Sequence, residues 1–140
     1  MVDVVACVVN WSTPDDLRGL VESAEIYEPG LRWSIYQNGG SPVDSEPTLE
    51  HLFGTYDPRV IIEDSEFNRG HGAGINHAVE SAYYMWDPEY VFVVNPDCVF
   101  TQPILTKLVN ALEEDPVRFT VGPKQVDSKR RITAGGIVGT

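Results

Sequence analysis

The sequence has few cysteines, and they are not arranged as a redox or metal motif. Cys7 and Cys98 are the only two among 140 residues, and they do not form a C-x-x-C pair. A disulfide framework or a zinc site needs more cysteines at closer spacing, so we expect two reduced thiols in or beside strands. The histidines, His51, His71 and His77, lack H-E-x-x-H spacing, which argues against a metal-hydrolase site.

Basic residues are also scarce. Ten Lys and Arg stand against 21 Asp and Glu, which gives a formal net charge of -11 at pH 7. Clustered Lys and Arg bind nucleic-acid phosphates, so this shortage argues against a nucleic-acid partner. If the ligand were a nucleotide diphosphate, an acidic protein would need a cation or local hydrogen-bond donors to offset the repulsion. That requirement favours a metal.

Long apolar spans and several common motifs are missing as well. No segment reads as a transmembrane helix and no signal sequence opens the chain, so we expect a soluble protein that stays in the cytosol. Neither a Walker loop nor a G-x-S-x-G elbow occurs. With 42% hydrophobic residues, the chain fits a single domain of residues 1–140 that buries a real core.

The chain does have a regular alternation of apolar strands and amphipathic helices. Continuous apolar runs at 4–9 and 90–94 predict strands buried on both faces, as in a parallel sheet covered by helices. Shorter runs predict strands at 33–36, 60–62, 119–121 and 132–136. Helical spacing predicts helices from Pro14, with Thr13 as N-cap, to Pro29, around 49–53, from the glycine-rich segment to Trp86, and over 103–114. This alternation is typical of a doubly wound, mostly parallel α/β sheet with helices on both faces.

Polar turns follow the predicted strands, and the turn at 95–97 is the leading candidate site. Ligands bind at the carboxyl ends of the strands in such sheets. Asp97 comes two residues after Asn95 and is held by Pro96, which makes it a plausible ligand for a hard divalent cation carrying phosphate oxygens. The alternative is an ordinary strand-to-helix turn in which Asp97 caps the next segment of the chain. The turns after Val9, Tyr36 and Ile62 would converge on the same crevice.

Two of these turns are rich in glycine. The sequence Gln37-Asn38-Gly39-Gly40-Ser41 permits left-handed backbone angles and close ligand approach, or is a plain surface loop. The segment 68–77 leads from a strand into a helix, where free backbone N–H groups form a natural anion cradle. It does not match the dinucleotide pattern G-x-G-x-x-G, because the sixth place from Gly70 is Ile75 and from Gly72 is His77.

The charge balance reverses after Gly122-Pro123. Basic residues there outnumber the acidic residue Asp127; they are Lys124, Lys129, Arg130 and Arg131. These cations could contact phosphate, or they are solvated turn charges.

The ordered turns resemble the N-terminal, donor-binding half of family 2 glycosyltransferases, especially rhamnosyltransferase-like and galactofuranosyltransferase-like members. Val8-Val9-Asn10-Trp11 is similar to the family's V-V-N-Y, and residues 37–41 are similar to its V-D-N-x-S turn. Asn68-x-Gly70-x-Gly72-x-Gly74-x-Asn76 is similar to N-x-G-x-(small)-x-(small)-x-N, and Asn95-Pro96-Asp97 to the N-P-D form of the D-x-D motif. Gly122-Pro123-Lys124 and Ala134-Gly135-Gly136 fall where those proteins carry G-P-K and A-G-G. The similarity covers essentially all 140 residues.

This resemblance implies a GT-A fold, a Rossmann-like nucleotide-diphospho-sugar transferase that transfers a sugar with inversion, using Mn2+ or Mg2+. It also implies roles for particular residues. Val9, Asn10, Trp11 and Gln37, with Asn38 in the same turn, would hold the base and ribose of the donor. The 68–76 segment would lie near the nucleotide and diphosphate through Asn68, Gly70, Gly72, Gly74 and Asn76. Asn95 and Asp97 would meet the ribose, metal and phosphates, with Asp97 as the metal ligand.

Two departures from the family leave alternatives open. Gln37 stands where the family commonly has an Asp that accepts a hydrogen bond from the base; its amide can accept the same bond but carries no charge, which leaves the identity of the donor open. Family members continue into an acceptor-binding half that holds the catalytic base, and we expect that half to be missing after Thr140. The acceptor, whether glycan, lipid-linked sugar or protein, stays unknown. A non-catalytic nucleotide-sugar-binding module and an oligomeric scaffold are the alternative functions.

Overall fold

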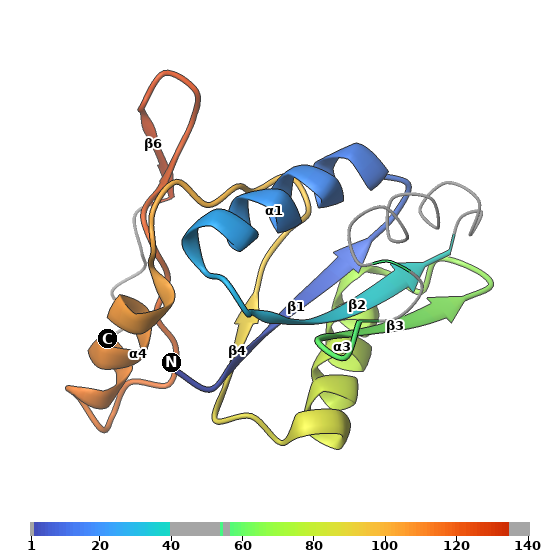
Figure 1. Cartoon of the computed structure of the whole chain (residues 1–140), viewed down its shortest axis with the longest axis horizontal. Coiled ribbons are helices and arrows are strands. Elements are labelled where there is room, and N and C mark those ends of the chain that lie inside the picture. The colour runs from blue at the N-terminus through green and yellow to red at the C-terminus, as the bar shows by residue number, and fades with distance from the viewer. Residues whose placement is uncertain (1, 40–53, 55–56, 135–140) are drawn as a thin grey trace. The chain divides into compact units, whose positions relative to one another are not determined.

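The computed structural model describes residues 2–39, 54 and 57–134 (Figure 1). The predicted helix at 49–53 lies outside these residues, as do Gly40, Ser41 and the pair Gly135-Gly136. The chain divides into two compact units, one of residues 3–102 and the other of residues 1–2 and 103–140.

The larger unit is built on a four-stranded parallel sheet with the order β3-β2-β1-β4. Every residue of β1 is buried, so β1 is the central strand of the core. The chain steps from β1 outward to β3 and then returns to the other side of β1. This reversal places the switch point of the sheet between β1 and β4. The strands are β1 Val4–Asn10, β2 Arg32–Asn38, β3 Val60–Ser65 and β4 Tyr90–Val93.

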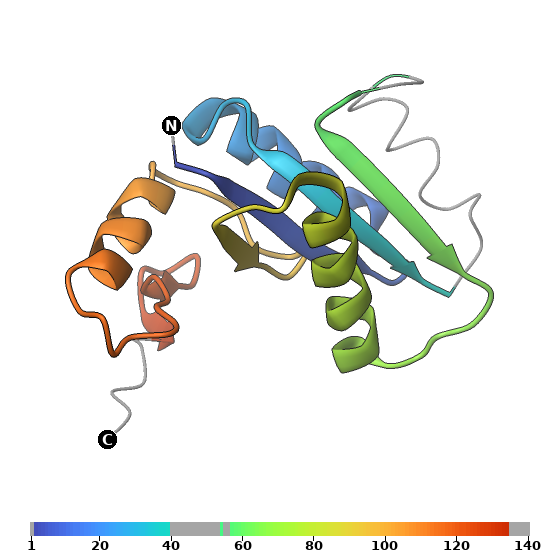
Figure 2. The same ribbon diagram turned by 90° about the horizontal axis from the view of Figure 1, so that it is seen from below.

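Two helices cover opposite faces of this sheet, α1 (Pro14–Tyr27) on one and α3 (His71–Trp86) on the other (Figure 2). Apolar residues at helical spacing bury one side of α1, as the sequence predicts; they are Leu17, Leu20, Val21 and Ala24. Helix α3 buries Gly74, Ala78 and Ala82. The predicted α/β architecture with a mostly parallel, doubly covered sheet is therefore confirmed.

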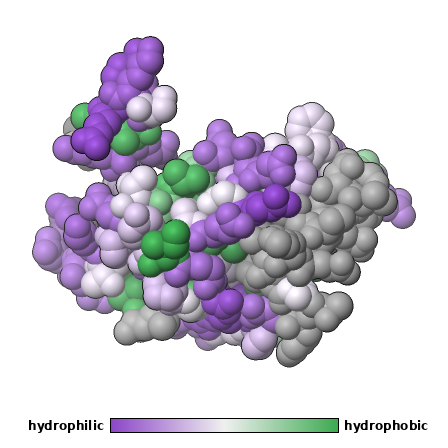
Figure 3. All heavy atoms as spheres, turned by 45° about the horizontal axis from the view of Figure 1, so that its top comes forward, coloured by the Kyte–Doolittle hydropathy of each residue, from purple (hydrophilic) through white to green (hydrophobic). Residues whose placement is uncertain are grey.

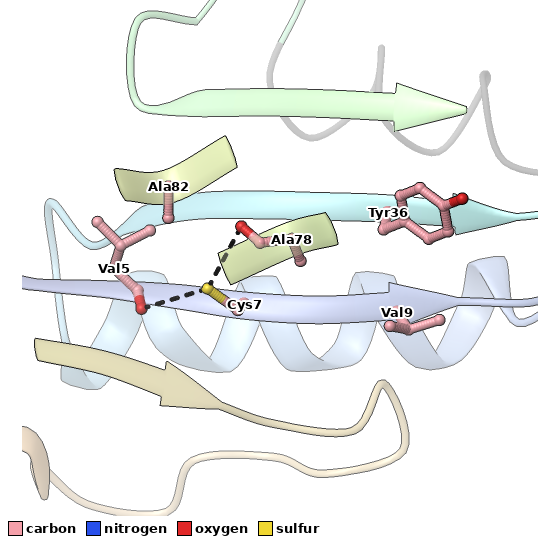
Figure 4. Packing of buried hydrophobic residues seen from close by; sticks show 6 residues of the cluster. All are labelled: Val5, Cys7, Val9, Tyr36, Ala78 and Ala82. Atoms are coloured by element: carbon pink, nitrogen blue, oxygen red, sulfur yellow. Dashed lines mark hydrogen bonds between the residues drawn. The ribbon is translucent and has the colours of Figure 1, made fainter. Parts of the chain in front are cut away.

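Alternation along β1 sends every second side chain toward α3. Figure 4 shows Val5, Cys7 and Val9 clustered with Tyr36 of β2 and with Ala78 and Ala82 of α3. The Cys7 Sγ lies 3.8 Å from the carbonyl oxygen of Ala78. Burial raises the pKa of the Cys7 thiol to about 12. Both cysteines are free, as expected.

Strand β4 does not have the predicted burial. The sequence predicts a strand covered on both faces, but β4 is an edge strand that pairs only with β1 among the described residues. Val91 packs partly against the cluster under α3, whereas Val93 is 48% exposed. The prediction was wrong because an apolar run indicates that a strand is partly buried. It shows neither which faces are covered nor whether the strand lies at the edge of the sheet.

The smaller unit contains helix α4 (Leu105–Glu113) and an antiparallel hairpin of β5 (Gln125–Val126) and β6 (Ile132–Ala134). The helix lies within the predicted range, and β6 confirms the predicted last strand over its first three residues. The predicted strand at 119–121 was wrong, since no strand forms there and Phe119 is 90% exposed. A run this short, closed by Gly122-Pro123, has no partner strand in the described part of the unit.

The surface agrees with the polar composition. Hydrophilic residues dominate the face drawn in Figure 3, and hydrophobic residues occur there in small separate groups. Within the described ranges, every helix is too short or too polar to cross a bilayer.

Candidate functional site

The carboxyl ends of the parallel strands share one edge of the sheet, as predicted. Asn10 pairs in register with Gln37, and Gln37 pairs with Asp64. The turns that carry the sequence motifs therefore follow neighbouring strand ends. The strand order puts β2 and β1 between the glycine-bearing turn after β3 and the turn after β4.

Strand β4 leaves the sheet earlier than its neighbour β1. The last partner pair is Cys7 with Val93, and the Val94 amide donates to the Cys7 carbonyl at 3.2 Å. Strand β1 continues to Asn10. The chain after Val94 thus turns away beside the last residues of β1, at the switch point where open α/β sheets bind ligands.

The segment 95–98 forms a β-turn that presents Asp97. The Cys98 amide donates to the Asn95 carbonyl at 3.2 Å, with Pro96 at the second position that this turn favours. The Asp97 side chain is exposed and has no hydrogen-bond or ion-pair partner in the part of the chain that the structure describes. Burial, and secondarily the charge of Asp97, raises the pKa of Cys98.

Ser23 of α1 anchors the far side of this turn. The Phe100 amide donates to Ser23 Oγ at 2.9 Å, and Ser23 Oγ donates to the Leu20 carbonyl at 2.7 Å. The ring centroids of Phe92 and Phe100 lie 5.8 Å apart. Asp97 is therefore held between two fixed points, Val94 and Phe100. Ser23 was not predicted from the sequence, because a serine inside a helix carries no local sign of a distant partner.

Asn10 and Gln37 lock the ends of β1 and β2 together. Asn10 Nδ2 donates to Gln37 Oε1 at 2.8 Å, and both side chains are buried. Thr13 takes the predicted N-cap position of α1, but its hydroxyl makes no cap bond and instead donates to Asn10 Oδ1 at 2.6 Å. Ser12 adopts a φ of 54°, and Trp11 is 58% exposed in this sharp turn.

Asn38 holds the turn after β3. Its Nδ2 donates to Asn68 Oδ1 and to the Gly70 carbonyl, both at 3.0 Å. Its Oδ1 accepts from the Arg69 amide at 2.9 Å. Asn68 Oδ1 also accepts from the Gly70 amide at 2.7 Å. The buried Asn38 amide is therefore occupied by protein partners on both of its polar atoms.

Gly39 lets these two turns pass at close range. Its φ of 75° confirms the left-handed backbone that the sequence predicts. A Cβ here would lie 2.4 Å from the Asn68 nitrogen and 2.6 Å from the Phe67 carbonyl carbon. The close approach that the glycine permits is thus made by the neighbouring backbone.

The glycines of the 68–76 segment have different roles. Helix α3 already begins at His71, so Gly72 and Gly74 lie in the helix rather than in a loop. A Cβ on Gly74 would lie 2.9 Å from Val9 Cγ2, which shows how closely α3 packs on the sheet. A Cβ on Gly72 would meet nothing within 4 Å. Gly70 is the N-cap, with no side-chain cap bond, so the first amides of α3 point outward.

The candidate residues therefore divide by exposure. The buried ones serve packing or hydrogen bonds within the protein; they are Val9, Asn10, Gln37, Asn38 and Gly74. The exposed ones face solvent, although Asn68 already accepts two hydrogen bonds through its Oδ1. They are Trp11, Asn68, Gly70, Gly72, Asn76, Asn95 and Asp97.

The donor set suits a cation that arrives with phosphate. No group of three or more His, Cys, Asp or Glu side chains that could hold a metal occurs among the described residues. Asp97 offers one exposed carboxylate, and Asn95 lies in the same turn. Mg2+ commonly takes one or two carboxylates and completes its coordination with phosphate oxygens and water. The residues fit such an ion and do not form an all-protein cage.

Comparison with known proteins gives one family. The model described as Glycosyl transferase family 2 matches residues 7–132. This range runs from the middle of β1 to the first residue of β6 and includes all of the motif-bearing turns at the sheet edge. No curated protein matches the chain.

Proposed function

The chain belongs to glycosyl transferase family 2, and from this we propose that it transfers a sugar from a nucleotide-diphosphate donor bound at the carboxyl edge of its sheet. Membership in the family supports a glycosyltransferase activity and a nucleotide-sugar donor in general terms. Dependence on a divalent cation, inversion at the sugar carbon and the roles of individual residues are our proposal.

Asp97 carries the proposal. It is an exposed carboxylate with no partner among the described residues, held in a closed turn beside the switch point of the sheet. A nucleotide that lies over the ends of β1 and β2 would direct its diphosphate toward β4 and Asp97. The exposed Trp11 ring would offer a flat surface to the base, while Asn95 would donate or accept beside the ribose.

The proposed transfer uses these positions. Mn2+ or Mg2+ on Asp97 would neutralise charge on the departing diphosphate, which stabilises the transition state more than the ground state. The outward amides at the start of α3 lie beside the end of β2 and would meet the nucleotide rather than the metal-bound phosphates. In inversion, the acceptor oxygen bonds to the anomeric carbon opposite the diphosphate as the sugar–phosphate bond breaks. A base takes the hydroxyl proton, and we assign no described residue to that role.

Thermal unfolding of the full chain tests donor binding. A ligand that binds only the native state raises the Tm, so Mn2+ or Mg2+ with uridine, thymidine or guanosine diphosphate should stabilise the chain when neither component alone does. Asp97→Asn should lose this stabilisation. Asp87→Asn removes an exposed carboxylate at the opposite end of α3 and should keep it. No shift with any nucleotide would contradict the proposal.

A second measurement separates an enzyme from a binding module. Nucleotide diphosphate released from nucleotide sugars, with or without added acceptors, reports transfer or hydrolysis. Donor binding without any release would assign the chain to the non-catalytic class.

A further inference from the structure

The segment 117–134 concentrates basic charge in a strongly acidic protein. Five of the ten Lys and Arg residues lie there against the single acidic residue Asp127, although the whole chain has a net charge of -11. Arg118 is paired with Asp115 just outside the segment, so the asymmetry rests on the four cations from Lys124 onward. The proposed sugar transfer does not use this segment.

Asp127 fixes the tip of the β5–β6 hairpin. Its Oδ1 accepts from the amides of Lys129 and Arg131 at 2.8 and 2.9 Å, and its Oδ2 accepts from Arg131 Nε at 2.7 Å. These bonds lower the pKa of Asp127. Arg131 is thus compensated by Asp127, and the tip turns through Arg130, whose φ is 61°.

The remaining cations of the hairpin have no acidic partner. Lys124, Lys129 and Arg130 are exposed and make no ion pair with any residue that the structure describes. The turn is held by backbone amides, so these cations are not needed to maintain it. Their charge is available to a partner.

Two aliphatic side chains lie next to these cations. Val126 and Ile132 are directly opposite each other in the hairpin, and opposed residues of an antiparallel pair project from the same face. They are 53% and 61% exposed. Burying the pair against an apolar surface would be favourable, whereas a free phosphate would give them no contact.

We propose that this hairpin rests on an anionic lipid bilayer. Val126 and Ile132 enter the boundary between headgroups and acyl chains, and Lys129 and Arg130 contact lipid phosphates. Combined aliphatic and basic groups are the features of a peripheral membrane contact. A nucleic acid would meet the cations but would offer the exposed Val126 and Ile132 no acyl-chain boundary to enter. With so few groups involved, the contact is weak and reversible.

Vesicle flotation of the full chain tests the proposal. The protein should float with vesicles of phosphatidylcholine mixed with phosphatidylserine, and not with phosphatidylcholine alone. Because each cation near an anionic surface contributes about a fivefold change in affinity, Lys129→Glu with Arg130→Glu should weaken binding by at least about 25-fold. Lys107→Glu, an exposed cation on α4 of the same unit, is the matched control and should have a much smaller effect.

The aliphatic contact is tested separately with Ile132→Thr, which keeps the β-branched side chain that strands favour. Its binding to mixed vesicles should fall several-fold while its Tm stays unchanged. Unchanged binding by Ile132→Thr, or displacement by inorganic phosphate, would show a phosphate contact only and overturn the proposal. Failure of the parent chain to float with mixed vesicles would overturn it as well. Neither result bears on the nucleotide-dependent rise in Tm, so the two proposals fail independently.

Discussion

The side-chain amide of Asn10 donates a 2.8 Å hydrogen bond to Gln37 Oε1, which joins the last paired residues of β1 and β2. Both residues are buried, and Thr13 occupies the other polar atom of Asn10. The resemblance to glycosyltransferases assigns Asn10 and Gln37 to the base and ribose. In the structure the same amides hold the strand ends that a donor would meet, so their first effect is on stability.

A double-mutant cycle measures this bond. Asn10→Ala and Gln37→Ala should each lower the free energy of unfolding by about 1–3 kcal/mol, because each leaves a buried polar group unsatisfied. The double variant should lose less than the sum by about 1 kcal/mol or more, read from urea unfolding. Strictly additive losses would show that the two amides are not coupled.

Gly39 and Gly72 form a matched pair of glycine substitutions. Gly39→Ala places a Cβ 2.4 Å from the Asn68 nitrogen at a φ of 75°. It should lose at least about 2 kcal/mol of unfolding free energy through strain and clash. Gly72→Ala adds a methyl group in open space within a helix and should be neutral or stabilising by up to about 1 kcal/mol. Equal effects in chemical denaturation would refute the close approach of the two turns.

Ser23 should control the local stability of the turn that carries Asp97. Ser23→Ala removes the acceptor for the Phe100 amide and should cost about 1 kcal/mol. Hydrogen exchange should then accelerate at the Phe100 amide and leave the amides of β1 unchanged. Ser81→Ala on α3, where no partner occurs among the described residues, is the control. Unchanged exchange at Phe100 in Ser23→Ala would remove Ser23 from its positioning role.

Cys7 should make stability fall in alkaline solution. The unfolded thiol ionises near the reference value of 9.0, whereas burial raises the folded pKa to about 12. The folded state therefore keeps the proton to higher pH than the unfolded state. The contribution of the neutral, buried thiol to the free energy of unfolding is complete below pH 9.0 and is lost as pH rises toward about 12. The loss should reach about 1.4 kcal/mol per pH unit in that window. Cys7→Ala should show a shallower decline in unfolding free energy over the same range, and an identical decline would exclude Cys7 as the cause.

The sequence was sufficient for features that depend on local pattern. The apolar run of β1, Pro14 at the start of α1, and the left-handed Gly39 each follow from neighbouring residues. Because parallel strands share one carboxyl edge, the alternation of elements also predicted where the motif turns would lie.

Features that depend on distant neighbours could not be predicted. Gly72 and Gly74 stand in the same short motif of α3, yet only Gly74 faces Val9 of β1 and Tyr36 of β2. The apolar composition of β4 did not reveal its place at the edge of the sheet. Likewise, the sequence shows that Asn38 has an amide side chain. It does not show that groups thirty or more residues away form hydrogen bonds with that amide.

Some candidate residues are buried and hydrogen-bonded within the protein, whereas others are exposed to solvent. This difference has a practical consequence for changing which sugar nucleotide the chain accepts. Variation at Trp11, Asn76 and Asn95 alters groups that face solvent and carry no contact needed for folding. Variation at Asn10 or Asn38 would first select for chains that still fold. Libraries for altered donor choice should therefore diversify the former and leave the latter fixed.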